Sequence, residues 1–236
     1  MPEPSRVVIA SHNRSKSREI EQLLRAGLCD LPVEICLLAD YPDAPPPPEE
    51  NADSYLGNAT IKAHACAAFT GAISLADDAG LEIDALNGQP GMYSRRFAGE
   101  RTPFPVKMGI LLEMLKDIPA ERRTARFRCA VAIALPSGEV FTFEDTLEGR
   151  IADAPRGQAG FGYDPIFFLP PLGCTLAELP AEFKNRISHR AKVMHQAIPK
   201  LRELLTESVS ATPAETGSDS QRLPTAPRAS VEPQCP

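Results

Sequence analysis

Short apolar runs that alternate with helix-like segments are the feature that most restricts how this chain can fold. Apolar runs at residues 6–10, 33–38 and 73–76 have the length and composition of buried strands. The segments at residues 15–26 and 53–69 repeat apolar residues at helical spacing, and a glycine follows each of them. Strands and helices in this alternation predict an α/β fold.

A hairpin and two further helices are predicted in the second half of the chain. Residues 126–135 and 140–147 are expected to form two strands joined by a turn at residues 136–138, which makes the sheet mixed. One helix is expected over residues 103–116, with proline at its first position, and another over residues 188–205. Ligands of such sheets bind in the loops beyond the strand ends, so polar clusters there are the candidate sites.

The C-terminal segment differs from the rest of the chain in composition. Beyond Glu207 the sequence is rich in Ser, Thr, Pro, Ala and Glu and has almost no large apolar residues. Such a segment buries too little surface to offset the entropy of ordering. We therefore expect one domain over residues 1–206 and a disordered tail over residues 207–236.

Charge and composition limit the classes of partner. The formal net charge is −6, whereas nucleic-acid binders carry a basic face, so no nucleic-acid partner is expected. A few lysines focused in a cleft can still attract a small anion. No apolar run approaches the ~20 residues that span a bilayer, no secretory signal is recognised, and no cysteines form a C-x-x-C pair. We expect a soluble, cytoplasmic protein without membrane contact.

The first polar cluster follows the first predicted strand. Small and amide residues there can present side chains and backbone N–H groups at a helix N-terminus, which favours an anion. An ordinary N-cap turn with a solvated lysine would have the same composition. The glycines and the Lys-Thr pair of a phosphate-binding P-loop are absent. The cluster consists of Ser11, His12, Asn13, Arg14, Ser15 and Lys16.

The second cluster is the acidic pair Asp77 and Asp78, which follows the run predicted as a strand at residues 73–76. Two carboxylates at a rigid strand end suit Mg²⁺, which takes hard oxygen ligands. One of them could also orient or deprotonate an attacking water. Acidic pairs are equally common in surface turns. Glu49 and Glu50, after the proline run, could add a metal ligand or simply be solvated.

The third cluster combines an aromatic, glycine-containing segment with basic residues further along the chain. An aromatic ring beside a glycine can stack on a flat base, while Asp and Arg side chains read its edge. The alternative is a core aromatic beside a tight turn, with His189 and Arg190 exposed. A zinc site is not expected, because the histidines show no ligand spacing. The cluster consists of Phe161, Gly162, Tyr163, Asp164, Lys184, His189 and Arg190.

Taken in order, these clusters resemble one family, the inosine/xanthosine triphosphate pyrophosphatases. The similarity runs from about Val7 to Leu204, and its motifs are weak singly but specific as an ordered set. They are Ser11-His12-Asn13-Arg14-Ser15-Lys16 with Glu19, Asn58-Ala59-Thr60-Ile61-Lys62-Ala63, Ala76-Asp77-Asp78-Ala79-Gly80-Leu81, Pro90-Gly91-Met92-Tyr93-Ser94, Gly160-Phe161-Gly162-Tyr163-Asp164-Pro165-Ile166-Phe167 and Ile187-Ser188-His189-Arg190.

The resemblance implies a two-lobed α/β fold around a long mixed sheet, with flanking helices, a central cleft and assembly as a homodimer. It implies Mg²⁺-assisted attack of water on the α-phosphorus of non-standard purine nucleoside triphosphates (ITP, dITP, XTP), with pyrophosphate leaving, which cleanses the nucleotide pool. By motif, Asp78 matches the general base and metal-linked aspartate, and Asp77 matches its partner. We choose Glu50 as the second metal ligand that the resemblance implies.

The same matching assigns the substrate contacts. Ser11 to Lys16 and Lys62 match the groups that hold the triphosphate, and the third cluster matches the base pocket. Two positions depart from the family pattern. Ala79 stands where a serine or threonine is usual, so a hydroxyl contact to substrate is absent or replaced by backbone. Ser-His replaces the commoner Thr-Gly, which places His12 near the phosphates.

Other functions remain compatible with the sequence. A pyrophosphatase of the same fold could act on pyrimidine or other modified nucleotides, and it would differ in the base pocket. A non-catalytic nucleotide sensor would keep Lys16 and Arg190 but have no use for Asp77 and Asp78. An interaction module acting through the tail has the least support, because the tail carries no recognisable motif.

Overall fold

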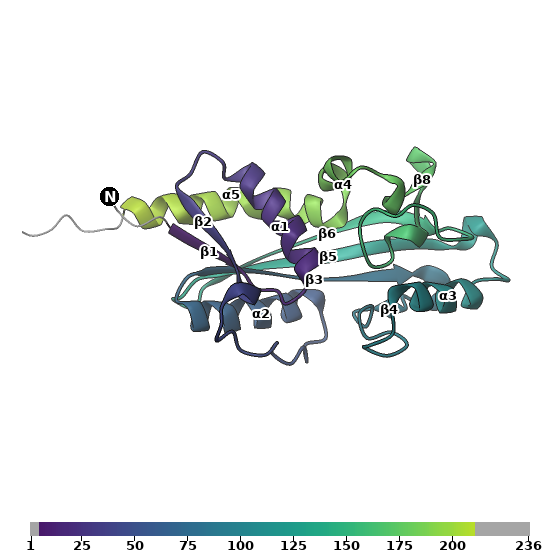
Figure 1. Ribbon diagram of the computed structural model, residues 1–236, viewed down its shortest axis with the longest axis horizontal. Coiled ribbons are helices and arrows are strands. Elements are labelled where there is room, and N and C mark those ends of the chain that lie inside the picture. The colour runs from purple at the N-terminus through teal and green to yellow at the C-terminus, as the bar shows by residue number, and fades with distance from the viewer. Residues whose placement is uncertain (1–4, 211–236) are drawn as a thin grey trace, which may run out of the picture.

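A long mixed sheet forms the centre of the molecule in the computed structural model, which describes residues 5–210, with side chains described for residues 5–207. Its strands are β1 (Ser5–Ile9), β2 (Val33–Leu37), β3 (Ile73–Ile83), β4 (Pro90–Gly91), β5 (Thr124–Ala134), β6 (Val140–Ile151), β7 (Phe167–Leu169) and β8 (Cys174–Thr175). The order across the sheet is β2-β1-β3-β5-β6-β7-β8, and β4 pairs with β3 (Figure 1). β1 is parallel to β2 and to β3. The pairs β3–β5, β5–β6, β6–β7 and β7–β8 are antiparallel. The predicted mixed sheet is confirmed.

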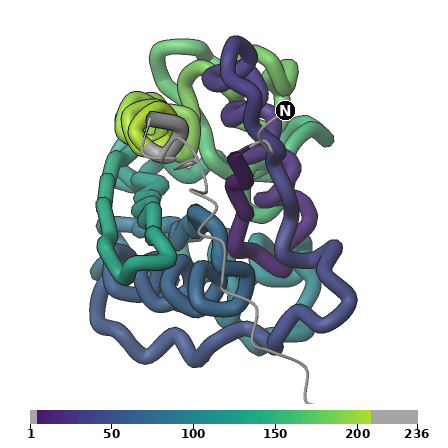
Figure 2. Tube along the Cα trace, turned by 90° about the vertical axis from the view of Figure 1, so that its left-hand side faces the viewer, coloured from purple at the N-terminus to yellow at the C-terminus, as the bar shows by residue number. Residues whose placement is uncertain are grey.

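Helices cover both faces of this sheet. They are α1 (Arg14–Gly27), α2 (Tyr55–Thr70), α3 (Phe104–Met114), α4 (Ala181–Ile187) and α5 (His189–Ser210). α1 and α5 pack on one face of the β1–β3–β5 region, and α2 packs on the other (Figures 1 and 2). A separate apolar cluster joins α3 to the far ends of β3, β5 and β6. The two lobes meet around the middle of the sheet, which confirms the predicted architecture.

β3 differs from its prediction in a way that matters for the site. The strand does not stop at Asp77 but continues to Ile83, and both aspartates pair with β5 in mid-strand. Acidic residues interrupt a strand pattern when they are solvated, but here basic side chains from other elements neutralise them. Because successive strand residues point to opposite faces, the two carboxylates are directed to different sides of the sheet.

Gly80 in β3 lies close to Gly91 of β4 and to Tyr55 of α2. A Cβ added there would lie 2.2 Å from the Gly91 carbonyl oxygen and 2.6 Å from the Tyr55 hydroxyl oxygen. We expect Gly80→Ala to lower the free energy of unfolding by about 1–3 kcal/mol through overpacking, as measured by urea denaturation. Gly109→Ala is the control: nothing lies within 4 Å of its added Cβ, so alanine should stabilise α3 by up to about 1 kcal/mol. Equal effects of the two substitutions would contradict this prediction.

Several boundaries also differ from those expected. α3 begins at Phe104, with Pro103 as the N-cap residue rather than the first helical residue. α4 and the strands β4, β7 and β8 were not predicted, because elements this short carry too few residues for a periodic pattern. α5 extends to Ser210, beyond the predicted start of the tail, and residues 211–236 lie outside the described residues. Among the described helices, none is long and apolar enough to cross a membrane.

Candidate active site

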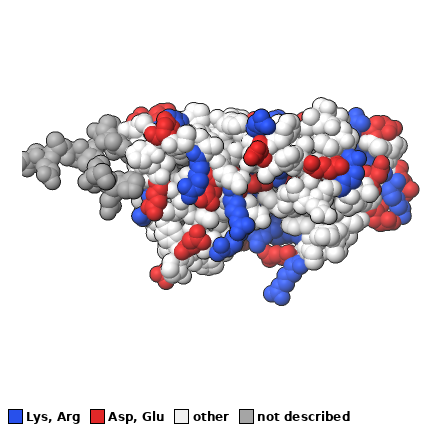
Figure 3. Space-filling view, turned by 45° about the horizontal axis from the view of Figure 1, so that its top comes forward, with Lys and Arg blue, Asp and Glu red and all other residues white. Residues whose placement is uncertain are grey.

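A cleft between the two lobes brings the three predicted clusters together. On one face of the molecule, Lys and Arg side chains gather across the middle (Figure 3). Of the predicted site residues, those that line the cleft are Ser11, His12, Asn13, Lys16, Glu50, Lys62, Asp77, Asp78, Ala79, Phe161, Gly162, Tyr163, Asp164, Lys184, His189 and Arg190. Arg14 and Ser15 do not line it. Arg14 instead lies 3.7 Å from Asp40 in a largely exposed ion pair.

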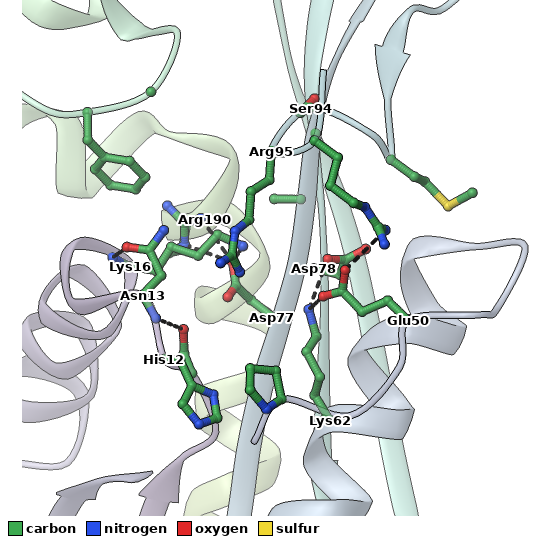
Figure 4. A pocket seen from close by; sticks show the side chains of 18 of the residues that line it. His12, Asn13, Lys16, Glu50, Lys62, Asp77, Asp78, Ser94, Arg95 and Arg190 are labelled. Carbon is green, nitrogen blue, oxygen red and sulfur yellow. Dashed lines mark hydrogen bonds and ion pairs between the residues drawn. The ribbon is translucent and has the colours of Figure 1, made fainter. Parts of the chain in front are cut away.

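The turn before α1 is arranged as an anion-binding helix N-terminus. Asn13 is the N-cap residue, and its Oδ1 accepts hydrogen bonds from the backbone N–H groups of Ser15 and Lys16, at 3.0 and 3.3 Å. The partial positive charge of the helix end and the Lys16 ammonium therefore face the same part of the cleft (Figure 4).

Asp77 is buried on the α1 and α5 side of β3. Its Oδ2 lies 3.2 Å from Lys16 Nζ and 2.9 Å from an Arg190 guanidinium nitrogen. Its Oδ1 has no hydrogen-bond partner in the described part of the chain. Burial by itself would raise the pKa of Asp77, but the charges of Lys16 and Arg190 outweigh it and hold the pKa below its usual range. Asp77 is thus an ionised structural anion that holds two cations at the cleft.

Asp78 faces the opposite side of β3, toward α2. Its Oδ1 lies 2.9 Å from Lys62 Nζ, and the same ammonium lies 3.1 Å from Glu50 Oε1 (Figure 4). Burial raises the pKa of Asp78, with the positive charge of Lys62 acting against it. Glu50 is not simply solvated, because Lys62 and Arg96 both pair with it. The two carboxylates that share one cation, Lys62, are therefore Asp78 and Glu50, and not Asp78 and Asp77.

A chain of buried ion pairs connects the acidic site to the aromatic segment. Arg190 bridges Asp77 and Glu19, with a guanidinium nitrogen 2.6 Å from Glu19 Oε2. Lys184 then bridges Glu19 and Asp164, at 2.6 Å from each. Glu19 belongs to the first motif but was given no role from sequence. Glu19 lies one helical turn after Lys16, so both side chains are on the same face of α1, and this spacing could have placed Glu19 at the site.

The aromatic segment is held by this chain. Asp164 accepts the backbone N–H of Phe161 at 2.9 Å, while the Lys184 and Arg190 cations lie 4.9 and 5.7 Å from the centre of the Phe161 ring. Tyr163 is buried and donates its hydroxyl to the Ser94 carbonyl oxygen at 2.9 Å. Asp164 and Arg190 are thus engaged in internal ion pairs and position the Phe161 ring.

His189 is a neutral imidazole in the same wall. It is 5% exposed and stacks on the Phe127 ring, with centroids 4.6 Å apart. Burial and the nearby Arg190 charge lower the pKa of His189 well below its usual value. Its Nδ1 has no hydrogen-bond partner among the described residues. The alternative that His189 and Arg190 are exposed is therefore wrong.

His12 connects the anion-binding turn to the proline run. Its Nε2 lies 3.1 Å from the Pro45 carbonyl oxygen, and the prolines lead on to Glu50. We expect His12→Ala to raise the KM for a nucleotide substrate up to about tenfold, because one hydrogen bond that orders the cleft is lost. Steady-state kinetics would test this, with His64→Ala on the exposed side of α2 as the control. An unchanged KM, or an equal rise in the control, would contradict it.

Arg95 and Arg96 were missed from the sequence. The Arg96 guanidinium lies 3.3 Å from Glu50 Oε2, and both arginines line the cleft. They follow directly after the motif that ends at Ser94, and two consecutive arginines beside a site motif could have indicated further anion-binding residues. They add positive charge to the cleft.

The chain is similar to known proteins over most of its length. The family model described as the Ham1 family matches residues 7–200. A dITP/XTP pyrophosphatase of Geobacter sulfurreducens is 45% identical over 80% of this chain and 93% of its own. One of Geobacillus kaustophilus is 45% identical over 86% of this chain and 95% of its own.

Solved structures show the same fold. A HAM1 protein from Coxiella burnetii superimposes with a TM-score of 0.74 and 38% identity, covering 84% of this chain and 99% of that one. A nucleoside-triphosphatase / dITP/XTP pyrophosphatase from Mycobacterium abscessus gives a TM-score of 0.64 and 40% identity, covering 82% and 99%. With a family model that matches nearly the whole described domain, the protein belongs to the Ham1 family.

Proposed function

We propose that this protein hydrolyses non-standard purine nucleoside triphosphates (ITP, dITP and XTP) to the monophosphate and pyrophosphate. The observation that carries the proposal is the arrangement of charge around Asp78. This carboxylate has a raised pKa and pairs with Lys62, and it lines the same cleft as Lys16 at the N-terminus of α1. Relatives named dITP/XTP pyrophosphatases support the reaction and the substrate class.

The chain's own groups divide the work of hydrolysis. Lys16, Lys62 and the N-terminus of α1 bind and orient the triphosphate, since phosphoryl transfer needs mainly positioning and charge neutralisation. Asp78 accepts a proton from the attacking water. The water oxygen forms a bond to the α-phosphorus, and the bond from that phosphorus to the bridging oxygen of pyrophosphate breaks. Asp77 holds Lys16 and Arg190 in place.

Asp78 and Glu50 fit a Mg²⁺ site. Their oxygens converge on one cation, the Lys62 ammonium, and Mg²⁺ in nucleotide sites is bound by one or two carboxylates together with phosphates and waters. No group of three or more His, Cys, Asp or Glu able to hold a metal exists among the described residues, so the remaining ligands would come from substrate and water. Bound there, Mg²⁺ would neutralise charge that develops on the phosphates.

The base would be selected at the Phe161 and His189 wall. The Phe161 ring offers a face for stacking, and buried donors beside it suit a 6-oxo group. Adenine presents an amino group at that position, which leaves such donors unpaired at about 1–3 kcal/mol for each buried polar group. The wall therefore favours hypoxanthine and xanthine over adenine.

The homodimer and the cytoplasmic location are part of the same proposal. Apolar side chains one helical turn apart on α3 support self-association: Val106, Ile110 and Met114 are 52, 37 and 45% exposed. The described cysteines are all free thiols, which suits a reducing compartment. Light scattering of the purified protein would report twice the chain mass, whereas a monomer at all concentrations would overturn the dimer.

Product analysis tests the reaction. The purified protein with Mg²⁺ would be incubated in parallel with ITP, XTP, ATP and GTP, scoring monophosphate plus pyrophosphate against diphosphate plus phosphate. Release of monophosphate and pyrophosphate from ITP and XTP, with little from ATP and GTP, is the expected result. Single phosphate release, activity on none of the four, or binding without turnover would overturn the proposal.

A further inference from the structure

Lys107 is a buried cation that the sequence motifs leave out. It lies on α3, is 1% exposed and lines the same cleft. Within the described residues it forms no ion pair, and its one hydrogen-bond acceptor is the Arg95 carbonyl oxygen. An ammonium has three donors and no acceptor. Donor capacity therefore remains on Lys107 at the wall of a ligand cleft.

An unpaired buried ammonium is unfavourable for folding. Taking a charge out of water without a carboxylate partner destabilises the folded state. Burial lowers the pKa of Lys107 and the charge of Arg95 adds to this effect, while the negative charge of Glu100 acts against it without outweighing it. The structural contact to Arg95 would be made equally well by a neutral donor, so packing alone does not account for a lysine here.

Lys107 lies at the end of the cleft that carries the aromatic segment. Its Nζ lies 5.2 Å from the centre of the Phe104 ring, and Phe104 packs edge-on against Tyr163 with centroids 5.1 Å apart. A Cβ on Gly162 would lie 3.8 Å from the Phe104 ring. α3 thus places Lys107 in the cleft wall beside the aromatic segment proposed to bind the base.

We propose that Lys107 is a specificity-determining residue that reads the 2-position of the purine base, an inference that rests on the proposed function. Purines differ there in hydrogen-bonding character: xanthine has a carbonyl oxygen, hypoxanthine only a hydrogen, and guanine an amino group. The ammonium donates to the oxygen of xanthine and tolerates hypoxanthine. It faces guanine donor to donor, which leaves both groups unpaired. Xanthine also loses a ring proton near neutral pH, and a positive charge stabilises that anion.

This role predicts an effect that depends on the substrate. If Lys107 only braced the loop at Arg95, its loss would impair all nucleotides equally. If it reads the 2-position, its loss impairs XTP, leaves ITP nearly unchanged and relaxes the discrimination against GTP. The ratio of kcat/KM values between substrates separates the two roles, since a shared structural defect cancels in the ratio.

The test compares Lys107→Met and Lys107→Gln with wild type on XTP, ITP and GTP. Lys107→Met should lower kcat/KM for XTP by about 10- to 100-fold, the effect of losing a charged hydrogen bond, and change that for ITP by less than about threefold. Lys107→Gln retains a neutral donor and should fall between wild type and the methionine variant. If the methionine variant does not fold, the glutamine variant alone still tests the role of Lys107. Lys116→Met, an exposed lysine just after α3, is the matched control.

Each outcome decides between specific claims. Equal losses on XTP and ITP, or XTP-to-ITP and XTP-to-GTP ratios that both variants leave unchanged, would overturn the role of Lys107 while the proposed function stands. Wild-type protein inactive on both XTP and ITP would overturn the proposed function itself. A selective loss on XTP together with a lower XTP-to-GTP ratio would support the inference.

Discussion

Asp78→Asn is expected to lower kcat on ITP by about 10²- to 10⁴-fold, the usual contribution of a positioned general base. Asparagine keeps the shape of the side chain but cannot accept the proton of the attacking water. Nucleotide binding should remain measurable, because Lys16 and Lys62 are unchanged. The loss should therefore appear in kcat more than in the dissociation constant, measured by steady-state kinetics and by calorimetry with a non-hydrolysable analogue.

The same substitution should not unfold the protein. The pKa of Asp78 is raised in the folded state by burial, so ionisation of this carboxyl above its unfolded pKa opposes folding, and a neutral amide removes that effect. Lys62 keeps its ion pair with Glu50, so the melting temperature should stay near the wild-type value. Asp84→Asn, just after the end of β3, is the control and should keep full activity. Turnover close to wild type in Asp78→Asn would refute the assignment of the base.

Arg190→Met is expected to lower the free energy of unfolding at pH 7 by about 3–5 kcal/mol, the usual effect of removing one partner from a buried ion pair. Arg190 is 2% exposed and contacts both Asp77 and Glu19. Methionine fills similar space but leaves Asp77 with only Lys16 and Glu19 with only Lys184. Urea denaturation measures the loss. Arg25→Met, which removes an exposed pair with Glu21 on α1, should change stability by no more than about 1 kcal/mol.

The defect of Arg190→Met should shrink as the pH falls from 7 to 5. In wild type the depressed pKa of Asp77 keeps it ionised throughout this range, so its stabilising effect is lost only at lower pH, as the carboxyl protonates through its folded pKa. In the variant the buried carboxylate lacks Arg190, its pKa rises, and protonation relieves the unpaired charge. A difference in stability that is the same at pH 7 and pH 5, or below about 1 kcal/mol, would contradict this account.

Much of the fold followed from local patterns. Apolar runs predicted β1 and β2, and the start of β3, while helical spacing with glycine stops predicted α1 and α2. These patterns report which face of each element is buried, and burial of apolar surface drives folding. The residues of the cleft were also named in advance, because the ordered motifs resemble those of one family.

What the sequence alone determined was therefore the longer helices and strands, the mixed sheet and the residue types gathered in the cleft. The tertiary structure decided which charges are partners: Asp77 with Arg190, far apart in the chain, and Asp78 with Lys62 and Glu50 on the opposite face of β3. It alone showed that β3 runs through both aspartates and that Lys107 is buried beside the base segment. The physical reason is that a buried charge is stable only when a partner or a ligand compensates it. Such partners come from distant segments of the chain, so the local sequence pattern does not identify them.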